Sequence, residues 1–461
     1  MIPPPTIHTG TYDQLAIAFC KGQIHLLDTP SRELLNLSDP YDPKLRKNLS
    51  YVGDASLYND QYYFYWGPVP SLLLCGIKFL FNGVVIGDEF FVLIPVVGTL
   101  ILFSLLAYEI QKKYFHALPT YLLIFGMLLA GLANPFTWIL NSPYIYGAAV
   151  ASGQFLVAAG IYSLFIGIQD GDRLRLFRIF LGGCFLAMAI GTRFTQILPA
   201  AIITLGVLAW YFMEHKPSRP SKELFALLFL LIFPQLIMGI ALASYNYVRF
   251  GSILEFGLRY QLAFVNMHKQ FRYVFSPLYL FPNLYNYLLN PFTVSQHFPY
   301  ILPQYGKLFR DSPIPFPRLY FSESITGMLF ASPILLFSGV TITTMLKRKQ
   351  MDNPSNLHRL QWLKICLTLS AFVNALVLLF FFDSAERYSI EVICFLIPLL
   401  IIGLWEGYTG LSARITARKV YLAVILLIGI ISILNSSLLA FSSTKDRFLI
   451  GNPALMNLLI H

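Results

Sequence analysis

The sequence predicts an all-α integral membrane protein with about 10–11 transmembrane helices and two external loop regions. Two observations support this prediction. The chain of 461 residues is 56% hydrophobic and only 12% charged, whereas a soluble globular chain is about 25% charged. In addition, ten stretches of the sequence approach the length of about 20 apolar residues that a spanning helix needs.

The ten apolar stretches follow one another along most of the chain, at 90–108, 118–135, 147–168, 176–193, 196–213, 224–243, 325–345, 361–382, 389–405 and 420–441. An eleventh stretch, 69–86, carries Lys78 near its middle and is interrupted by Asn82-Gly83. A lysine at the centre of a spanning helix costs about 2.5–3.5 kcal/mol on insertion scales. We therefore expect residues 69–86 to form a juxtamembrane or re-entrant helix.

The charges of the connecting segments predict the orientation. Basic residues gather in segments that the positive-inside rule places in the cytoplasm, at 111–116, 170–178, 214–223, 347–364 and 413–419. Residues 1–68 and 244–324 then lie outside. The net charge of +10 belongs to these short loops beside membrane lipid, so it does not indicate a nucleic-acid partner.

The chain accordingly divides into four parts. Residues 1–68 form an external loop region with acidic residues, and 69–243 form an N-terminal transmembrane bundle. Residues 244–324 form an external loop with juxtamembrane helices, and 325–461 a C-terminal transmembrane bundle. Within the second loop, 249–275 favours a helix lying on the bilayer surface. The five cysteines show neither CxxC spacing nor a disulfide framework.

The first external region offers two candidate catalytic carboxylates, Asp13 and Asp54. Asp54 precedes LYNDQYYFY (57–65), where alternation around Asn-Asp predicts a short hairpin that holds Asp54 just above the membrane. The alternative interpretation makes Asp13 a helix cap and Asp54 a cap or turn residue. Asp39 and Asp42, in SDPYDP, either face one divalent cation or are solvated turn residues.

Several arginines face the same outer surface in this topology. Arg193 and Arg387 each stand at the end of an apolar stretch, and a guanidinium forms paired hydrogen bonds with phosphate oxygens. A basic residue next to an outward-facing carboxylate suits chemistry on a lipid-linked phosphate, whereas the alternative is snorkelling to lipid headgroups. The full set of candidate substrate-binding residues is Arg193, Arg249, Arg259, Arg387, Tyr63 and Tyr388.

Motifs of other chemistries do not occur. The histidines show neither HxH nor HExxH spacing, and the sequence has no Walker motif, no GxGxxG opening a helix and no GxSxG. Nucleotide-driven and serine-hydrolase chemistry therefore have no support. Apart from a divalent cation at Asp39 and Asp42, the sequence predicts no cofactor.

Four stretches carry a resemblance to a known group of proteins: YDQLAIAFCKGQIHL (12–26), GDASLYNDQYYFYWGPVPSLLL (53–74), GTRFTQILPA (191–200) and YNYVRFGSILEFGLRYQLA (245–263). ERYSIEVICFLIPLL (386–400) is a weaker fifth. They resemble the polytopic GT-C glycosyltransferases, which include protein mannosyltransferases and bacterial aminoarabinose transferases. The sequence looks most like uncharacterised bacterial members of that superfamily.

The resemblance implies an inverting transfer of a sugar from a polyprenyl-phosphate donor to a glycan, lipid or protein acceptor. It also implies that a carboxylate in the first external loop activates the acceptor, while basic residues stabilise the leaving phosphate. Asp13 matches the group's early loop acid approximately, and Asp54 is the next candidate. The group often has Gly-Lys-Pro-Pro-Leu before its second membrane segment, where this sequence has Gly67-Pro68-Val69-Pro70 and lacks that lysine.

The resemblance also implies a location and leaves alternatives. We expect a multi-pass protein of the bacterial inner membrane with its active site facing the periplasm or exterior. The group has a transmembrane helix ahead of the first loop, and this sequence begins within that loop, so we expect a missing upstream helix. The alternative functions are a flippase or transporter of a lipid-linked glycan, and an inactive membrane homologue.

Overall fold

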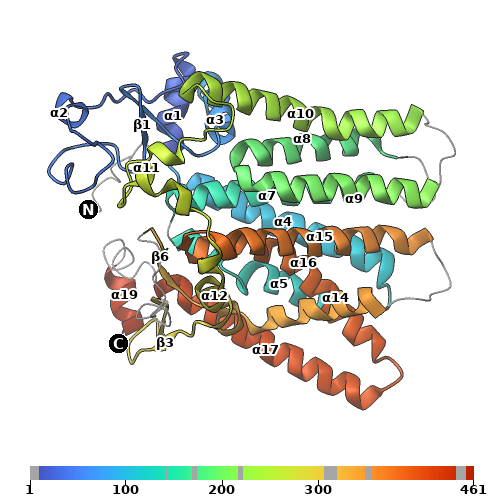
Figure 1. Cartoon of the computed structure of the whole chain (residues 1–461). Coiled ribbons are helices and arrows are strands. Elements are labelled where there is room, and N and C mark those ends of the chain that lie inside the picture. The colour runs from blue at the N-terminus through green and yellow to red at the C-terminus, as the bar shows by residue number, and fades with distance from the viewer. Residues whose placement is uncertain are drawn as a thin grey trace.

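The computed structural model describes residues 10–81, 83–141, 143–168, 174–215, 222–305, 319–347, 355–442 and 453–460. Long helices lie side by side (Figure 1). The two loop segments that the sequence predicts to lie outside, called the external segments below, gather at one end. Seven helices in these ranges are long and apolar enough to cross a membrane. They are α4 (Phe90–Tyr114), α7 (Ile145–Gly167), α9 (Ile197–His215), α10 (Lys222–Phe250), α15 (Ser355–Phe380), α16 (Glu386–Gly410) and α17 (Ile415–Ser442).

Shorter apolar helices account for the other predicted stretches. These are α3 (Val69–Leu80), α5 (Thr120–Leu132), α8 (Leu176–Thr192), and the 3-10 turn η6 (Pro333–Phe337) that continues into α14 (Ser338–Lys347). The short helix α6 (Phe136–Asn141) follows α5. The predicted all-α integral membrane architecture is thus confirmed, although several predicted spans are shorter than 18 residues.

Two helices form the centre of the bundle. α7 packs against α4, α8 and α16, and α16 also packs against α14 and α15. In α16, 89% of the most apolar window is buried, against 17% in α10, so α10 lies at the outside. Small residues bring α7 and α8 together, because a Cβ at Gly182 of α8 would lie 2.5 Å from Leu164 Cγ of α7.

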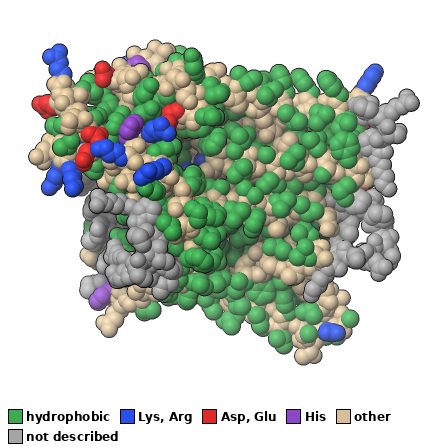
Figure 2. All heavy atoms as spheres, in the orientation of Figure 1, with side chains coloured by type: hydrophobic (Ala, Val, Ile, Leu, Met, Phe, Trp, Pro, Cys, Tyr) green, Lys and Arg blue, Asp and Glu red, His purple; other side chains and the backbone are tan. Residues whose placement is uncertain are grey.

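The external region at one end carries most of the visible charged side chains, whereas hydrophobic side chains cover much of the bundle (Figure 2). It contains α1 (Thr11–Cys20), α2 (Arg32–Leu35), β1 (Ser56–Tyr58) and β2 (Gln61–Tyr63). The predicted hairpin is confirmed, because β1 and β2 pair antiparallel with Ser56 opposite Tyr63. Asn59 and Asp60 both have positive φ, 46° and 58°, as a type I′ turn requires.

The second external segment does not form the surface helix expected over 249–275. α10 ends at Phe250, and Gly251 and Gly257 follow with φ of 69° and 96°, a region that favours glycine and ends a helix. Short elements follow instead: η2 (Leu258–Tyr260), α11 (Met267–Gln270), η3 (Phe271–Tyr273), η4 (Pro277–Tyr279), α12 (Leu280–Leu284) and the π-turn η5 (Tyr285–Leu289).

Four two-stranded pairings complete the described elements. Besides β1–β2, β3 (Thr293–Val294) pairs with β4 (Ile301–Leu302), and β5 (Gln304–Tyr305) with β7 (Ser324–Ile325). β6 (Phe321–Ser322) runs parallel to β8 (Asp383–Ser384), which ties the external loop to the segment just before α16. The helices α13 (Met328–Ala331) and α19 (Pro453–Ile460) are short.

The α1–α3 corner differs from the sequence-based expectation in two ways. Cys20 and Cys75 form a disulfide with Cα atoms 5.6 Å apart, although no framework was expected. This pairing joins α1 to α3, two elements whose contact the cysteine spacing does not reveal. The cap of α1 is Gly10 rather than Thr11 or Asp13, and the carboxylate of Asp88 accepts from the N–H of Thr11 at 3.0 Å.

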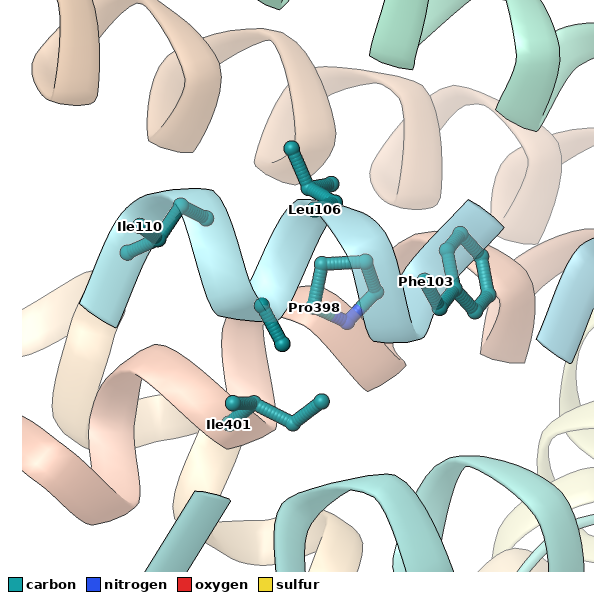
Figure 3. A pocket seen from close by; sticks show the side chains of 6 residues that line it. Phe103, Leu106, Ile110, Pro398 and Ile401 are labelled. Carbon is teal, nitrogen blue, oxygen red and sulfur yellow. The ribbon is translucent and has the colours of Figure 1, made fainter. Parts of the chain in front are cut away.

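A small cavity of about 10 Å³ lies between α4 and α16 (Figure 3). It is lined by apolar residues that include Phe103, Leu106 and Pro398. A cavity of this size is at the limit for one water molecule, and an apolar lining gives a water no partners. This space is a packing gap of the core.

Candidate active site

A second cavity, of about 650 Å³, lies at the external end of the bundle. Both external segments contribute to it, together with the ends of α7 and α8, the turn η1 (Phe194–Gln196) and the start of α16. Residues 54–67, 254–275 and 381–388 are far apart in the sequence but share this wall. The cavity brings four of the predicted site residues together: Asp54, Arg193, Arg387 and Tyr388.

Backbone contacts fix the position of Asp54. Its N–H donates to the carbonyl of Leu262 at 3.4 Å, and the Leu262 N–H donates to the carbonyl of Ala55 at 2.9 Å. Asp54 has a φ of 59°, a left-handed conformation in which aspartate is one of the better-tolerated residues. The Tyr146 hydroxyl donates to Oδ2, and the amide of Gln261 donates to Oδ1 at 3.2 Å. Both of these side-chain partners are neutral.

The Gly67-Pro68-Val69-Pro70 stretch places the start of α3 against the end of α8. A Cβ at Gly67 would lie 2.3 Å from the carbonyl oxygen of Gly191 and 2.4 Å from that of Thr192. Only glycine permits this approach. The same contact holds the loop that carries Asp54 beside Arg193, the residue at which α8 ends.

Arg193 projects from the end of α8 into the cavity. Its Nε donates to Oε1 of Glu391, which is fully buried in α16. The guanidinium carbon also lies 5.5 Å from the ring centroid of Tyr388. This ion pair through Nε fixes the orientation of the planar guanidinium group of Arg193.

Arg387, at the start of α16, has two carboxylate partners. Its Nη1 donates to Glu323 at 2.6 Å and its Nη2 to Asp383 at 3.5 Å. The guanidinium carbon lies 4.8 Å from the ring centroid of Tyr146 and 4.7 Å from that of Tyr388. Tyr146 therefore contacts both Asp54 and Arg387, and Tyr388 lies within reach of both arginines.

The carboxyl group of Asp383, at this end of the bundle, has a pKa well above its usual value. It is 8% exposed, and burial raises its pKa to about 7, while Arg387 lowers it and Glu323 raises it. Burial disfavours a charged carboxylate. Asp383 therefore changes its charge near neutral pH, where a group is best suited to exchange protons.

Much of the cavity wall is aromatic. Phenylalanines line it from the second external segment, from η1 and from the segment before α16: Phe194, Phe256, Phe264, Phe271, Phe275, Phe321, Phe381 and Phe382. An apolar wall around a few convergent polar groups is the usual composition of a site for an organic ligand. The volume and the wall fit an amphipathic ligand with a polar head.

The other predicted site residues lie outside the cavity lining. Asp13 is fully buried, with Lys78 Nζ 2.6 Å from Oδ1. Arg249 donates to the carbonyl of Phe64 and to the side chain of Asn246, at 2.7 Å each. Arg259 pairs with Glu255 at 3.8 Å on the surface. Tyr63 is buried in β2 beside Phe250.

Asp39 and Asp42 also lie elsewhere, near the tip of the first external segment. Asp39 Oδ2 contacts Lys269 Nζ at 2.8 Å, and Oδ1 of Asp42 accepts from the backbone N–H of Lys44 at 2.9 Å. Among the residues that the structure describes, no three His, Cys, Asp or Glu side chains gather as metal ligands would. The divalent-cation hypothesis for these two residues stays a prediction.

The sequence-based interpretation missed Tyr146, Glu323, Asp383 and Glu391. Asp383 and Glu391 stand four residues before and after Arg387. Because Asp383 lies in β8, before α16 begins, helical charge spacing was an available signal for Glu391 alone. Tyr146 and Glu323 had no local signal, because their proximity to Asp54 and Arg387 arises from the tertiary fold.

The fold of this chain is similar to that of the solved oligosaccharyltransferase of Archaeoglobus fulgidus tethered with an acceptor peptide. That structure aligns with 96% of this chain at a TM-score of 0.50 and 12% sequence identity.

A second structure, of AglB from the same archaeon with an inhibitory peptide and a dolichol-phosphate, covers 96% of this chain at a TM-score of 0.46 and 14% identity. The chain spans about half the length of these proteins, 52% and 53%. No protein-family model matches the sequence, and no curated protein matches it.

Proposed function

We propose that this protein is a glycosyltransferase that takes a sugar from a polyprenyl-phosphate donor at the external end of the membrane bundle. The observation that carries the proposal is the convergence of Asp54, Arg193 and Arg387 on one cavity with an aromatic wall. The GT-C fold is consistent with this function, although a fold alone does not establish chemistry.

Asp54 is the proposed general base. Its described side-chain partners, Tyr146 and Gln261, are neutral donors, so its negative charge is not cancelled by a cation. It accepts the proton of the acceptor hydroxyl as the acceptor oxygen forms a bond to the anomeric carbon. The bond from that carbon to the phosphate oxygen breaks, and the phosphate leaves with the electron pair. Attack opposite to the leaving group inverts the configuration.

Arg193 is the proposed ligand of the leaving phosphate. Preorganised positive charge next to a developing anion lowers the barrier by about 2.7–4 kcal/mol per donor in comparable sites. Arg193 has one carboxylate partner, whereas Arg387 is shared by two. A dianionic phosphate therefore meets less negative charge beside Arg193.

The external location has independent support from the Cys20–Cys75 disulfide. Disulfides persist in oxidising compartments and are rare in the cytosol. The disulfide joins α1 to α3, which lie at the end of the bundle where the external segments gather (Figure 1). The basic last turn of α4, with Lys112 and Lys113, lies at the opposite end. Both observations favour a cavity that faces the periplasm or exterior.

The test uses membranes that contain the full chain and a radiolabelled polyprenyl-phosphate sugar. The expected result is release of polyprenyl phosphate with transfer of label to an acceptor in the membrane, and loss of both in Asp54→Asn. Asp13→Asn serves as the comparison, because Asp13 lies outside the cavity lining. Full transfer by Asp54→Asn would overturn the assignment of the base. Movement of intact donor across sealed vesicles without transfer would indicate a flippase instead.

A further inference from the structure

The end of the cavity around Asp383, Glu323 and Arg387 has a composition unlike that around Arg193. Glu323 follows β6 and Asp383 begins β8, and these strands run parallel with Phe321 opposite Asp383. The N–H of Glu323 donates to the carbonyl of Ser384 at 2.9 Å, which fixes this arrangement. Arg387 contacts both carboxylates. The three side chains together therefore comprise two acidic groups and one basic group.

Two polar atoms in this group lack a hydrogen-bond partner among the described residues: Oδ1 of Asp383 and Nε of Arg387. One is an acceptor and the other a donor. Buried polar groups are normally paired, and an unpaired one costs about 1–3 kcal/mol. These two atoms are themselves buried, but both residues line the cavity together with the partly exposed carboxylate of Glu323, so the group suits a ligand that both donates and accepts hydrogen bonds.

We propose that Asp383, Glu323 and Arg387 form the subsite that holds the sugar ring of the donor. This inference rests on the proposed function and adds to it which end of the cavity takes the sugar. A sugar hydroxyl both donates and accepts a hydrogen bond, which matches the carboxylate and guanidinium atoms of this group. Adjacent hydroxyls of one ring present several such groups together.

Charge separates this subsite from the phosphate position. A phosphate placed beside Arg387 would face the carboxylates of both Glu323 and Asp383, whereas an uncharged polyol meets no repulsion there. Burial raises the pKa of Asp383 to about 7, so near neutral pH this carboxyl is present in both forms and either accepts from or donates to a hydroxyl.

The aromatic residues beside the group complete a wall for a ring. Phe321 of β6, Phe382 just before β8 and Tyr388 of α16 all line the cavity. Aromatic side chains cover large apolar areas and have few rotatable bonds, so they cover the C–H face of a sugar while its hydroxyls reach the polar group. Asp54 is connected to this end through Tyr146, which contacts both Asp54 and Arg387.

The test compares binding of sugar-free polyprenyl phosphate with binding of polyprenyl phosphate carrying glucose, galactose or mannose. The whole chain is used in lipid nanodiscs without acceptor. We expect the wild type to bind at least one glycosylated lipid more tightly than the sugar-free lipid. Asp383→Asn and Glu323→Gln should each reduce that preference, measured as the ratio of the two affinities, about tenfold, the effect of one lost hydrogen bond to a charged group.

Glu33→Gln is the control, because Glu33 is an exposed carboxylate of α2. The proposed subsite would be refuted if the wild type bound all the lipids with equal affinity. It would also be refuted if both variants kept the wild-type preference for the glycosylated lipid. Failure of the wild type to bind even the sugar-free lipid would count against the proposed function itself. Because Glu323 is partly exposed, its variant keeps the test valid if Asp383→Asn fails to fold.

Discussion

Asp13 and Asp54 lie in the same external region and belong to the same residue type, yet their surroundings differ. Asp13 is fully buried, with Lys78 Nζ at 2.6 Å and the Ile86 N–H at 3.2 Å. Asp54 lines the 650 Å³ cavity, and its side-chain partners within the described ranges, Tyr146 and Gln261, are neutral. The carboxylate of Asp13 is part of the packed contact between α1 and α3, whereas that of Asp54 lies at a cavity that a ligand can enter.

The largest expected effect is a loss of catalysis when Asp54, rather than Asp13, is replaced. Asp54→Asn should lower the rate of sugar transfer about 10²–10⁴-fold, the usual contribution of a general base, with little change in thermal stability. Initial rates on purified protein of known folded fraction provide the measurement. A variant that keeps the wild-type rate would contradict the role given to Asp54.

The second expected effect is that the surroundings of Asp13, unlike those of Asp54, matter for the stability of the fold. Lys78→Met leaves the Asp13 carboxylate buried without its cation, which costs about 3–5 kcal/mol. We expect a strongly lowered melting temperature in detergent but an unchanged rate per folded molecule. The double variant Asp13→Leu with Lys78→Met should recover much of the stability, because an apolar pair can replace a buried ion pair. Equal melting temperatures for the wild type and Lys78→Met would show that this pair does not stabilise the corner.

The features that could be predicted from the sequence are those with a local pattern. The apolar stretches predicted the bundle, and the LYNDQYYFY alternation predicted the β1–β2 hairpin, since both signals are local periodicities. Asp54, Arg193, Arg387 and Tyr388 were predicted as site residues and do meet in one cavity.

The remaining features depend on contacts that no local pattern records. The Asp13–Lys78 pair, the Cys20–Cys75 disulfide and the Tyr146–Asp54 contact each join residues at least 55 positions apart. A charged residue in an apolar sequence signals a special environment, but whether it becomes a closed ion pair or a cavity wall is decided by tertiary packing.

A third effect contrasts Asp383 with Asp39 on the outer surface. Burial raises the pKa of Asp383 from 3.8 to about 7. Burial also acts on Asp39, but hydrogen bonds from Lys269 and Tyr41 lower its pKa below the ordinary value. A raised carboxyl pKa contributes stability that is fully present below pH 3.8 and is lost as the pH rises through about 7. A lowered one contributes stability that is lost as the pH falls.

We therefore expect the stability that Asp383 contributes to decline as the pH rises from about 4 to about 7. The decline amounts to about 1.4 kcal/mol for each unit by which the pKa is raised. Asp383→Asn should flatten this part of the profile, whereas Asp39→Asn should change only its acidic side. Melting temperatures across the pH range provide the measurement. A profile that Asp383→Asn leaves unaltered would show that Asp383 does not titrate there.

The smallest expected effect compares two arginines. Arg193 lines the cavity, whereas Arg249 donates to the Phe64 carbonyl and the Asn246 side chain away from it. Lysine keeps the charge but lacks the planar fork that binds phosphate through two donors. Arg193→Lys should raise the KM for the lipid donor about tenfold, the loss of one charge-assisted hydrogen bond, with a smaller change in kcat.

Arg249→Lys is the matched control, because it makes the same chemical change outside the cavity. It should leave the donor KM unchanged and lower the melting temperature, since the Phe64 carbonyl and the Asn246 side chain lose their described donor. Equal KM increases in both variants would mean that the two arginines act through the fold alone. An increase confined to Arg193→Lys would support direct contact with the donor, because Arg193 alone of the two reaches the cavity.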